Sequence, residues 1–575
     1  MRKQTKVVAV ASAAALLAIG ASMTSFAATG WVEEDGTWYF YDKDGNRVED
    51  AWKKSGDNWY WLDSEEGGAM AIDKLIDDDN NTYYVDSNGV MVRNTWVKVV
   101  NEDQDDDEDP AEYNYYYMQS NGKAYKASDN TTSTRFKTID GKRYAFDEDG
   151  KMLYGWVNGD AERLTDEDDW AQVNPEVYYL GAWDDGAMKT GWQKITVHDE
   201  QEDDDMDYWF WFKSNGKRFY NDEKDTKNKN VKDKKINGRK YGFDDRGVMV
   251  YEWMIATPST NSTASASSWQ YFNSPEDGAR VTKGWFKVVA PNEDNTFNSE
   301  TYGGSFAATH ADDEEEHWYY ADGDGKLYSG AIKKIKGKYY AFRPDDGDKG
   351  AAMLNGLVLM AVDSQGNITE IQDDGVDSDE LSDILDGTTA VNAGCSLYYF
   401  GNDEDSDGAM KTGNTTVTLD GDTYNFMFSK TGGAEGKGKG LHGVYDGKSI
   451  YMYGCKLKAG SDDKYIVAYA KGDTGSDDAE VIKYDSKNIR NAVYPGLKDE
   501  SNDLDNDVTN KDGDTVRGIT GFSGDCYLLN TSGTIVKNKT AARDGDDWYF
   551  YVDDKNVIQY TNNKNLKDTI FENWK

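Results

Sequence analysis

The chain has 575 residues, and its 64 basic against 106 acidic side chains give a formal net charge of −42. This balance argues against a nucleic-acid partner, because binding to phosphates needs a basic surface that releases counterions. The aromatic share of 13% argues against a disordered chain, because disordered chains are poor in rings. The rings recur at fixed distances from glycines, so we expect folded structure without one thick core.

The N-terminal segment has the order of a secretory signal peptide. Positive residues between 2 and 6 precede an apolar run at 7–21, and Ser25-Phe26-Ala27 supplies small residues for cleavage. The apolar run is shorter than the roughly 20 residues that a membrane span needs. We therefore expect secretion without a membrane span. Because the C-terminal end carries no sorting-type motif, we expect non-covalent attachment to the cell surface.

Internal repeats begin at Gly30. Trp52 repeats Trp31 and Trp59 repeats Trp38 at one interval of 21 residues, and a period near 20 is typical of a hairpin array or solenoid. The unit consists of two to four aromatics, a short Asp/Asn/Gly turn and Gly-x-Met. It returns as TYYVDSNGVM, RYAFDEDGKM, VYYLGAWDDGAM, KYGFDDRGVM and LYYFGNDEDSDGAM. Rings favour strands and the turn residues tolerate positive φ, so each unit is predicted to be a β-hairpin that stacks on its neighbours.

A longer period lies above the short one. Ile139, Ile236 and Ile335 follow one another at intervals of 97 and 99 residues, which indicates that blocks of several hairpins were duplicated together. One hairpin in each block carries an acidic insertion. These insertions are NEDQDDDEDPAEYN, HDEQEDDDMD and residues 292–317. We expect them to be solvated hairpin tips.

This pattern resembles the cell-wall-binding repeat family, also called choline-binding repeats, whose unit is approximately GW, a linker, G-x-WYY, a turn and G-x-M. The resemblance covers residues 30 to about 360 and returns in the fragments SLYYFGNDEDSDGAMKTGN, IYMYG and DDWYFYVDDKNVI. It implies an all-β fold, a β-hairpin repeat solenoid of the choline-binding-repeat type. It also implies that rings from consecutive hairpins box the choline groups of teichoic acids by cation–π contact.

The expected domains follow from the resemblance and the composition. They are a signal peptide at 1–27, cell-wall-binding hairpin repeats at 28–356, an acidic spacer at 357–394, and degenerate repeats with a C-terminal β region at 395–575.

The resemblance places the aromatic cages at four sets of rings. These are Trp31 with Trp38 and Tyr60, Trp52 with Trp59 and Tyr84, Trp192 with Trp209 or Trp211, and Trp285 with Trp318 and Tyr320. Each ring also fits a purely structural role between hairpins.

Some positions depart from the family pattern. Leu75 stands where a repeat-opening Trp is expected, and Tyr144, Tyr241 and Tyr339 replace the strand Trp in the short repeats. Several cages must therefore be incomplete. Related repeats in secreted glucosyltransferases and clostridial toxins also resemble this chain and bind glycans, so the sequence leaves choline and glycan both open as ligands.

The sequence offers little catalytic chemistry. It has no metal-type histidine spacing, no nucleophile elbow and no phosphate-binding loop, and we expect no catalytic residue, metal or cofactor. Cys395, Cys455 and Cys526 allow one disulfide with one free thiol.

The expected function is that of a non-enzymatic protein that binds the cell wall or surface through choline-bearing teichoic acid or another glycan. An extracellular glycan-binding adhesin is the first alternative. The second is a wall-anchored enzyme with a catalytic part within 361–545. The sequence also leaves a homodimer open.

Overall fold

The computed structural model describes residues 29–104, 110–127, 134–200, 202–223, 229–256, 266–291, 296–297, 315–345, 350–403, 405, 407–432, 436–474, 479–484, 507–509, 515–517, 520–522, 525–545, 548–556 and 558–561. The predicted signal peptide at 1–27 and most of the insertion at 292–317 lie outside these residues. The chain divides into two compact units. Unit 1 runs to residue 236 and includes 241–250, and unit 2 comprises 237–240 and the residues from 251 onward.

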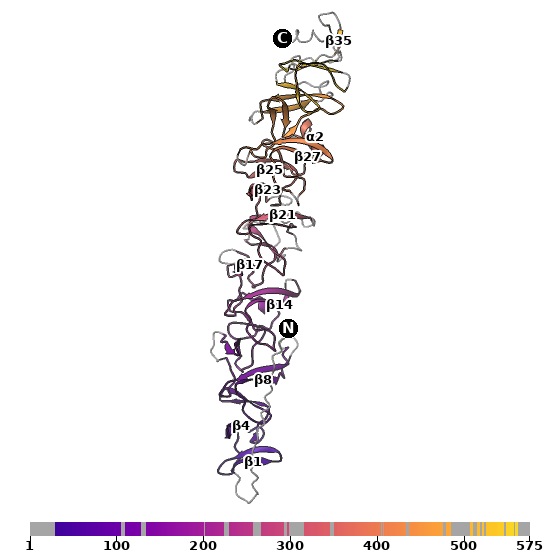
Figure 1. Cartoon of the computed structure of the whole chain (residues 1–575). Coiled ribbons are helices and arrows are strands. Elements are labelled where there is room, and N and C mark those ends of the chain that lie inside the picture. The colour runs from indigo at the N-terminus through magenta and orange to yellow at the C-terminus, as the bar shows by residue number, and fades with distance from the viewer. Residues whose placement is uncertain are drawn as a thin grey trace. The chain divides into compact units, whose positions relative to one another are not determined.

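Unit 1 is built of antiparallel β-hairpins, which Figure 1 shows following one another in chain order from indigo to magenta. Its elements are β1 (Gly30–Glu34), β2 (Thr37–Tyr41), β3 (Ala51–Ser55), β4 (Asn58–Asp63), β5 (Ala69–Met70), β6 (Lys74–Asp78), β7 (Asn81–Val85), β8 (Thr95–Val100), β9 (Tyr113–Met118), β10 (Lys137–Ile139), β11 (Lys142–Tyr144), β12 (Trp156–Val157), the 3-10 helix η1 (Asp169–Ala171), β13 (Tyr178–Tyr179), β14 (Gly191–Asp199), β15 (Asp204–Phe212) and β16 (Lys232–Ile236). The first five strands form one sheet in the order β1-β2-β5-β4-β3. Strand β17 (Arg239–Phe243) spans the boundary between the units.

Unit 2 begins with further hairpins and continues into larger antiparallel sheets. Its elements are β18 (Glu252–Ile255), the 3-10 helix η2 (Ala266–Ser268), β19 (Trp269–Phe272), β20 (Gly284–Val289), β21 (Glu316–Ala321), β22 (Ala331–Ile335), β23 (Lys338–Phe342), β24 (Leu357–Val362), β25 (Ile368–Asp373), α2 (Ser378–Asp386), β26 (Ser396–Tyr399), β27 (Gly413–Leu419), β28 (Asp422–Phe428), β29 (Gly443–Tyr445), β30 (Ser449–Met452), β31 (Cys455–Lys456), β32 (Tyr465–Lys471), β33 (Glu480–Tyr484), β34 (Asp507–Thr509), β35 (Thr515–Arg517), β36 (Thr520–Phe522), β37 (Cys526–Asn530), β38 (Ile535–Val536), β39 (Lys539–Arg543), β40 (Tyr549–Val552) and β41 (Ile558–Thr561). The predicted all-β fold of solenoid-like hairpin repeats is confirmed.

The hairpin of β10 and β11 shows why these residues fold in this way. Ile139 pairs with Lys142, which leaves Asp140 and Gly141 as a two-residue turn with φ of 48° and 81°. A turn of this length requires positive φ at both positions, which Asp and Gly tolerate better than other residues. The Asp-Gly pair between the two strands therefore specifies the two-residue turn of this hairpin.

A second turn follows each hairpin and joins it to its neighbours. We call the residue two positions after the positive-φ glycine or alanine of this turn the exit residue. Its backbone N–H donates a hydrogen bond to a strand carbonyl of the preceding hairpin. These bonds run from Met91 to Trp59 (2.9 Å), from Met152 to Tyr115 (2.7 Å), from Met249 to Trp209 (2.8 Å) and from Met353 to Trp318 (2.8 Å). Because an isolated hairpin is marginal in water, these bonds and the rings beside them hold the array together.

The segment 357–394, predicted to be an acidic spacer, contains two strands and a helix. Strand β24 is buried along its whole length. Helix α2 begins with a capping box between Asp377 and Glu380 and ends at Gly387 in the left-handed conformation. Leu381 and Ile384 of this helix pack into the main core of unit 2. The acidic residues of this segment therefore cap and cover a folded element.

The second acidic insertion lies at the tip of the hairpin of β14 and β15. Its described acidic residues at 200, 202–205 and 207 are exposed, as expected for a solvated tip. Asp199 at the end of β14 is the exception. Asp199 is only 3% exposed, and its carboxylate accepts hydrogen bonds from the Tyr208 hydroxyl (2.7 Å) and the Arg246 guanidinium (2.7 Å). Such a buried carboxylate is stable only when it is paired in this way.

The three cysteines are free thiols, and all of them are buried. Cys395 and Cys455 pack in the main core of unit 2, and Cys526 packs in a second core that includes Phe550. Burial raises the pKa of the Cys455 and Cys526 thiols to about 12, so they stay protonated at neutral pH. The disulfide that the sequence allowed is not formed.

The contact between one repeat and the next predicts that replacing two different glycines by alanine destabilises the protein by different amounts. A Cβ on Gly89 would lie 2.8 Å from Met70 Cε and 3.0 Å from the Ala71 carbonyl oxygen, whereas a Cβ on Gly141 would meet no atom within 4 Å. Both have positive φ, so Gly141→Ala is the matched control for backbone strain alone. Gly141→Ala should cost about 1 kcal/mol, and Gly89→Ala a further 1–3 kcal/mol or so. Thermal unfolding followed by near-UV circular dichroism measures both, and equal shifts in the midpoint would contradict the packing argument.

Candidate ligand-binding site

Three junctions between consecutive hairpins share one arrangement of rings. Each has an opening Trp, two rings on the second strand of its hairpin, a Tyr and a Phe on the next hairpin, and a methionine exit residue. Box A contains Trp96, Tyr115, Tyr117, Tyr144, Phe146 and Met152; box B contains Trp192, Trp209, Trp211, Tyr241, Phe243 and Met249; box C contains Trp285, Trp318, Tyr320, Tyr340, Phe342 and Met353.

The ring geometry repeats closely among the boxes. The opening Trp meets the Tyr of the next hairpin edge-on at 4.9 Å in box A, 4.9 Å in box B and 4.8 Å in box C. It meets its cross-strand ring at 5.3, 5.2 and 5.1 Å. The Phe of the next hairpin stacks on it at 5.9, 5.7 and 5.6 Å. Edge-to-face and offset stacked pairs at these distances are favourable, so the rings are both packing and walls.

The remaining ring of each box lies two residues earlier on the second strand. In box B, Trp209 is perpendicular to Trp192, with the ring centroids 6.2 Å apart at 90°. In box C, Trp318 and Trp285 are 6.3 Å apart at 83°. All four tryptophans are partly buried, so each holds one edge in the core and keeps part of its surface accessible.

A lysine lies directly across the hairpin from this ring in each box. The pairs are Lys98 with Tyr115, Lys194 with Trp209, and Lys287 with Trp318. In boxes B and C, a carboxylate binds the ammonium group: Lys194 pairs with Asp207 at 3.3 Å and Lys287 pairs with Asp405 at 2.7 Å.

Asp405 forms an ion pair at the edge of box C. Its carboxylate accepts hydrogen bonds from Lys287 and from the Trp318 indole N–H (3.0 Å), and these bonds lower its pKa. Burial raises the pKa of the Tyr340 phenol in the same box, so the ring stays neutral. Box C therefore combines uncharged ring faces, which suit a cation, with an ion pair of no net charge at its edge.

Comparison with known proteins identifies the repeats. A sequence profile described as "Putative cell wall binding repeat" matches residues 29–46, 50–66, 74–91, 134–152 and 313–327. These five segments are therefore repeats of the cell-wall-binding type. Such repeats indicate association with the cell wall. No curated protein matched the sequence. Within the described ranges, no helix is long and apolar enough to cross a membrane.

Several solved structures from Streptococcus pneumoniae are similar to this repeat protein. The modular autolysin LytC is 15% identical, with a TM-score of 0.28 over 59% of this chain and 56% of its own. The repeat protein thus spans little more than half the length of LytC. CbpJ is 14% identical, with a TM-score of 0.30 over 70% of this chain and 98% of its own. The choline-binding domain of CbpL is 20% identical, with a TM-score of 0.21 over 52% of this chain and 97% of its own.

The predicted cage residues fall into two groups. In the later part of this repeat protein, Trp192 contacts both Trp209 and Trp211, and Trp285 contacts both Trp318 and Tyr320. These six residues lie in boxes B and C.

The first predicted cages are arranged differently. Trp31 contacts Tyr60 at 5.3 Å as predicted and also packs on Phe40, while Trp38 lies across the hairpin from Glu33. Tyr60 is only 3% exposed and acts as a core ring.

At the next junction, Trp52 lies against Trp61 and, on the following hairpin, against Tyr83 at 5.1 Å. Trp59 packs in the same hydrophobic cluster. The predicted partner Tyr84 is on the opposite face of β7, where it pairs with Leu75 and donates its hydroxyl to Asp73.

Sequence reasoning missed box A and the tyrosines of the next hairpin. A usable signal was present, because Tyr144, Tyr241 and Tyr340 each follow one of the periodic isoleucines by five residues. Tyr144 and Tyr241 depart from the family pattern in the sequence, but in the structure both contact an opening Trp. The sequence pattern also assigns Tyr339 to the third position, but the ring next to Trp285 is Tyr340.

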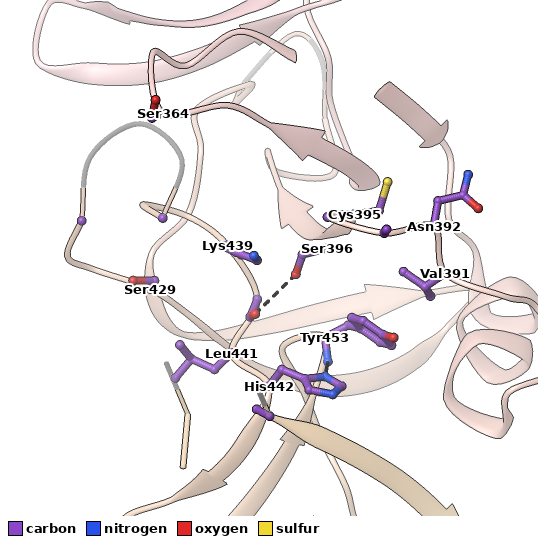
Figure 2. A pocket seen from close by; sticks show the side chains of 16 residues that line it. Ser364, Val391, Asn392, Cys395, Ser396, Ser429, Lys439, Leu441, His442 and Tyr453 are labelled. Carbon is purple, nitrogen blue, oxygen red and sulfur yellow. Dashed lines mark hydrogen bonds between the residues drawn. The ribbon is translucent and has the colours of Figure 1, made fainter. Parts of the chain in front are cut away.

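A separate cavity of about 860 Å³ lies in unit 2 among residues 391–396, 439–442 and Tyr453 (Figure 2). His442 accepts a hydrogen bond at Nδ1 from the Tyr453 backbone N–H (3.2 Å), and burial lowers its pKa to about 4. Figure 2 shows the Cys395 sulfur pointing away from His442. Burial and the nearby Glu370 raise the pKa of this thiol. Cys395 and His442 are therefore not arranged as a nucleophile and its base.

The buried His442 predicts a pH dependence of stability. Burial and the positive charge of Lys439 lower its pKa in the folded protein below the ordinary 6.5. As the pH falls, the unfolded chain therefore binds a proton before the folded protein does. The contribution of His442 is fully present above about pH 6.5 and is lost progressively toward pH 4, up to about 3 kcal/mol. His442→Asn keeps an acceptor for the Tyr453 N–H and removes the titration. The thermal midpoint should therefore drop more between pH 7 and pH 4.5 in the wild type than in the variant. Equal drops in the two proteins would contradict the assignment to His442.

Proposed function

We propose that this protein is a secreted, non-enzymatic wall-binding protein that holds choline groups of a wall polymer in boxes A, B and C. The observation that carries the proposal is the repeated pairing of a partly exposed opening Trp with a second ring at its side. This ring is perpendicular to the opening Trp at 90° in box B and at 83° in box C. Attachment through these boxes is non-covalent.

Choline fits this geometry better than other common wall groups do. A quaternary ammonium has no hydrogen-bond donor, so several ring faces around it form its natural receptor, each worth about 0.5–2 kcal/mol. Perpendicular walls enclose a compact cation from two sides. The net charge of −42 favours a cationic group over an anionic one.

Repetition increases the strength of attachment. Teichoic acid presents many choline groups along one polymer, and boxes A, B and C belong to one chain. Once one box is occupied, binding at the next becomes intramolecular, so the overall avidity exceeds the affinity of any single box. Weak individual boxes are therefore sufficient for stable retention on a wall.

A glycan-binding adhesin is the second candidate. Partly exposed Trp and Tyr faces also stack on sugar rings, and Tyr271 with Phe286 in unit 2 forms a stacked pair at 13°. A third candidate, catalysis within 361–545, would need reacting groups other than Cys395 and His442, because these two are not paired.

Choline chromatography tests the proposal. The wild type should bind a choline resin and elute with free choline. Substituting the side wall in two boxes, Trp209→Leu with Trp318→Leu, should weaken binding by about 2- to 30-fold per box because one ring face is lost from each. Tyr445→Leu is the control, since Tyr445 is an exposed ring that belongs to none of the three boxes.

The outcomes separate the candidates. Retention on the resin that free choline does not reverse would contradict choline binding. Binding to a glycan array that choline leaves unchanged would favour the adhesin. Equal elution of the double variant and the Tyr445→Leu control would show that the boxes are not the site.

A further inference from the structure

One junction of box-like rings has an arginine as its exit residue. In boxes A, B and C the exit residue is methionine, but at the junction opened by Trp156 it is Arg218. The Arg218 backbone N–H donates to the Val177 carbonyl at 2.8 Å, as the Met249 N–H donates to Trp209 in box B. Arginine therefore occupies the structural position that methionine has elsewhere.

A second contact confirms this equivalence. A Cβ on Gly247 would lie 2.8 Å from Arg218 Cδ, just as a Cβ on Gly89 would lie 2.8 Å from Met70 Cε. Both exit side chains thus run over the turn glycine of the following repeat. The two residue types differ in what they bring to the junction, since methionine ends in a neutral thioether and arginine in a cation.

The rings around Trp156 resemble those of the boxes. Trp156 packs on its cross-strand partner Tyr179 at 5.1 Å and, on the next hairpin, on Phe210 at 5.1 Å and Phe212 at 5.9 Å. A further ring, Trp170 of η1, lies 6.5 Å away. The junction therefore has the ring faces that a cation needs.

The Arg218 guanidinium supplies that cation from within the chain. The side chain is fully buried, and Cζ lies 5.8 Å from the centroid of the Trp156 ring. Its two terminal nitrogens donate to the backbone carbonyls of Trp170 and Gln172. Burial lowers its pKa to about 10, so it remains charged at neutral pH.

The pairing of the nearby charges explains why the rings matter to Arg218. Asp244, the carboxylate that most favours its charge, forms its ion pair with Arg246 at 2.9 Å. Arg218 Nε has no hydrogen-bond partner among the described residues. A buried charge in this position needs compensation beyond two carbonyls, and ring faces provide it.

We propose that Arg218 is a built-in occupant of the Trp156 junction, where its guanidinium takes the role that an external quaternary ammonium has in boxes A, B and C. This junction then binds no choline, because the side chain of its own exit residue fills it. The inference rests on the proposed function of the boxes.

The long hairpins are those that carry an insertion, namely β8–β9, β14–β15 and β20–β21. The other two junctions that lead into a long hairpin also leave no open ring box. At the junction opened by Trp253, the exit residue is Leu327, and Trp253 and Trp269 are both 0% exposed. At the junction opened by Leu75, no tryptophan is present and the exit residue is Ala124. Boxes A, B and C instead lie at the end of a long hairpin, where it meets the short hairpin that follows.

Counting choline sites tests the inference. Isothermal titration of the full chain with choline chloride gives the number of sites in the wild type. Arg218→Met should add one site, because it removes the internal cation and restores the methionine of an open box. The reverse change in box B, Met249→Arg, should remove one site.

Each outcome has a defined meaning. An Arg218→Met protein with a native near-UV spectrum and an unchanged number of sites would overturn the inference. If that variant loses its native spectrum, Met249→Arg decides: one site fewer supports the inference, and an unchanged number overturns it. A wild type that binds no choline overturns the proposed function itself, which separates that failure from failure of the Arg218 inference alone.

Discussion

An isolated β-hairpin buries too little surface to be stable in water, so each hairpin of this chain depends on the rings that it shares with the next. The joint has three parts: the opening Trp inserted between two hairpins, the backbone hydrogen bond from the exit residue, and the exit side chain that covers the next turn glycine. Box A shows all of them at Trp96 and at Met152, whose side chain a Cβ on Gly186 would meet. Stability is then a sum over joints along the array.

This constraint explains why one set of rings has both a structural and a binding role. A ring that must contact two hairpins is fixed in orientation and needs no rearrangement to receive a ligand. Where its outer face stays accessible, as at Trp209 and Trp318, the joint is also a receptor for a compact cation. Where the face is covered by the chain itself, as at Trp253, the joint only stabilises the fold. Pre-organised walls of this kind reduce the entropic cost of binding.

Periodicity in the sequence was sufficient to predict the hairpins and the opening tryptophans, because turn chemistry and ring spacing act locally. It did not settle which face of a strand each ring occupies. Side chains alternate with a period of two, so an error of one residue exchanges the core face with the outer face. Tyr84 for Tyr83 and Tyr339 for Tyr340 are errors of this kind. At Trp192 both alternative strand residues, Trp209 and Trp211, contact the ring, so the choice between them does not matter there. Trp318 and Tyr320 are two positions apart and share one face of β21, where both contact Trp285.

Long-range pairing was beyond the reach of the sequence pattern. Asp199 at the end of β14 is buried because Arg246, 47 positions later in the chain, pairs with its carboxylate. The segment 357–394 folds because a buried strand and the apolar face of α2 join the core of unit 2. The sequence pattern did not distinguish Arg218 from an ordinary turn residue, because Gly-x-Met and Gly-x-Arg follow the same turn and only the fold shows that Arg218 is buried.

The most direct measurement of the central claim is a crystal structure of the full chain grown with saturating choline. The account predicts one choline group between Trp192 and Trp209 and another between Trp285 and Trp318, with the Arg218 guanidinium still in place beside Trp156. Empty boxes at saturation, or choline bound only away from these rings, would contradict it.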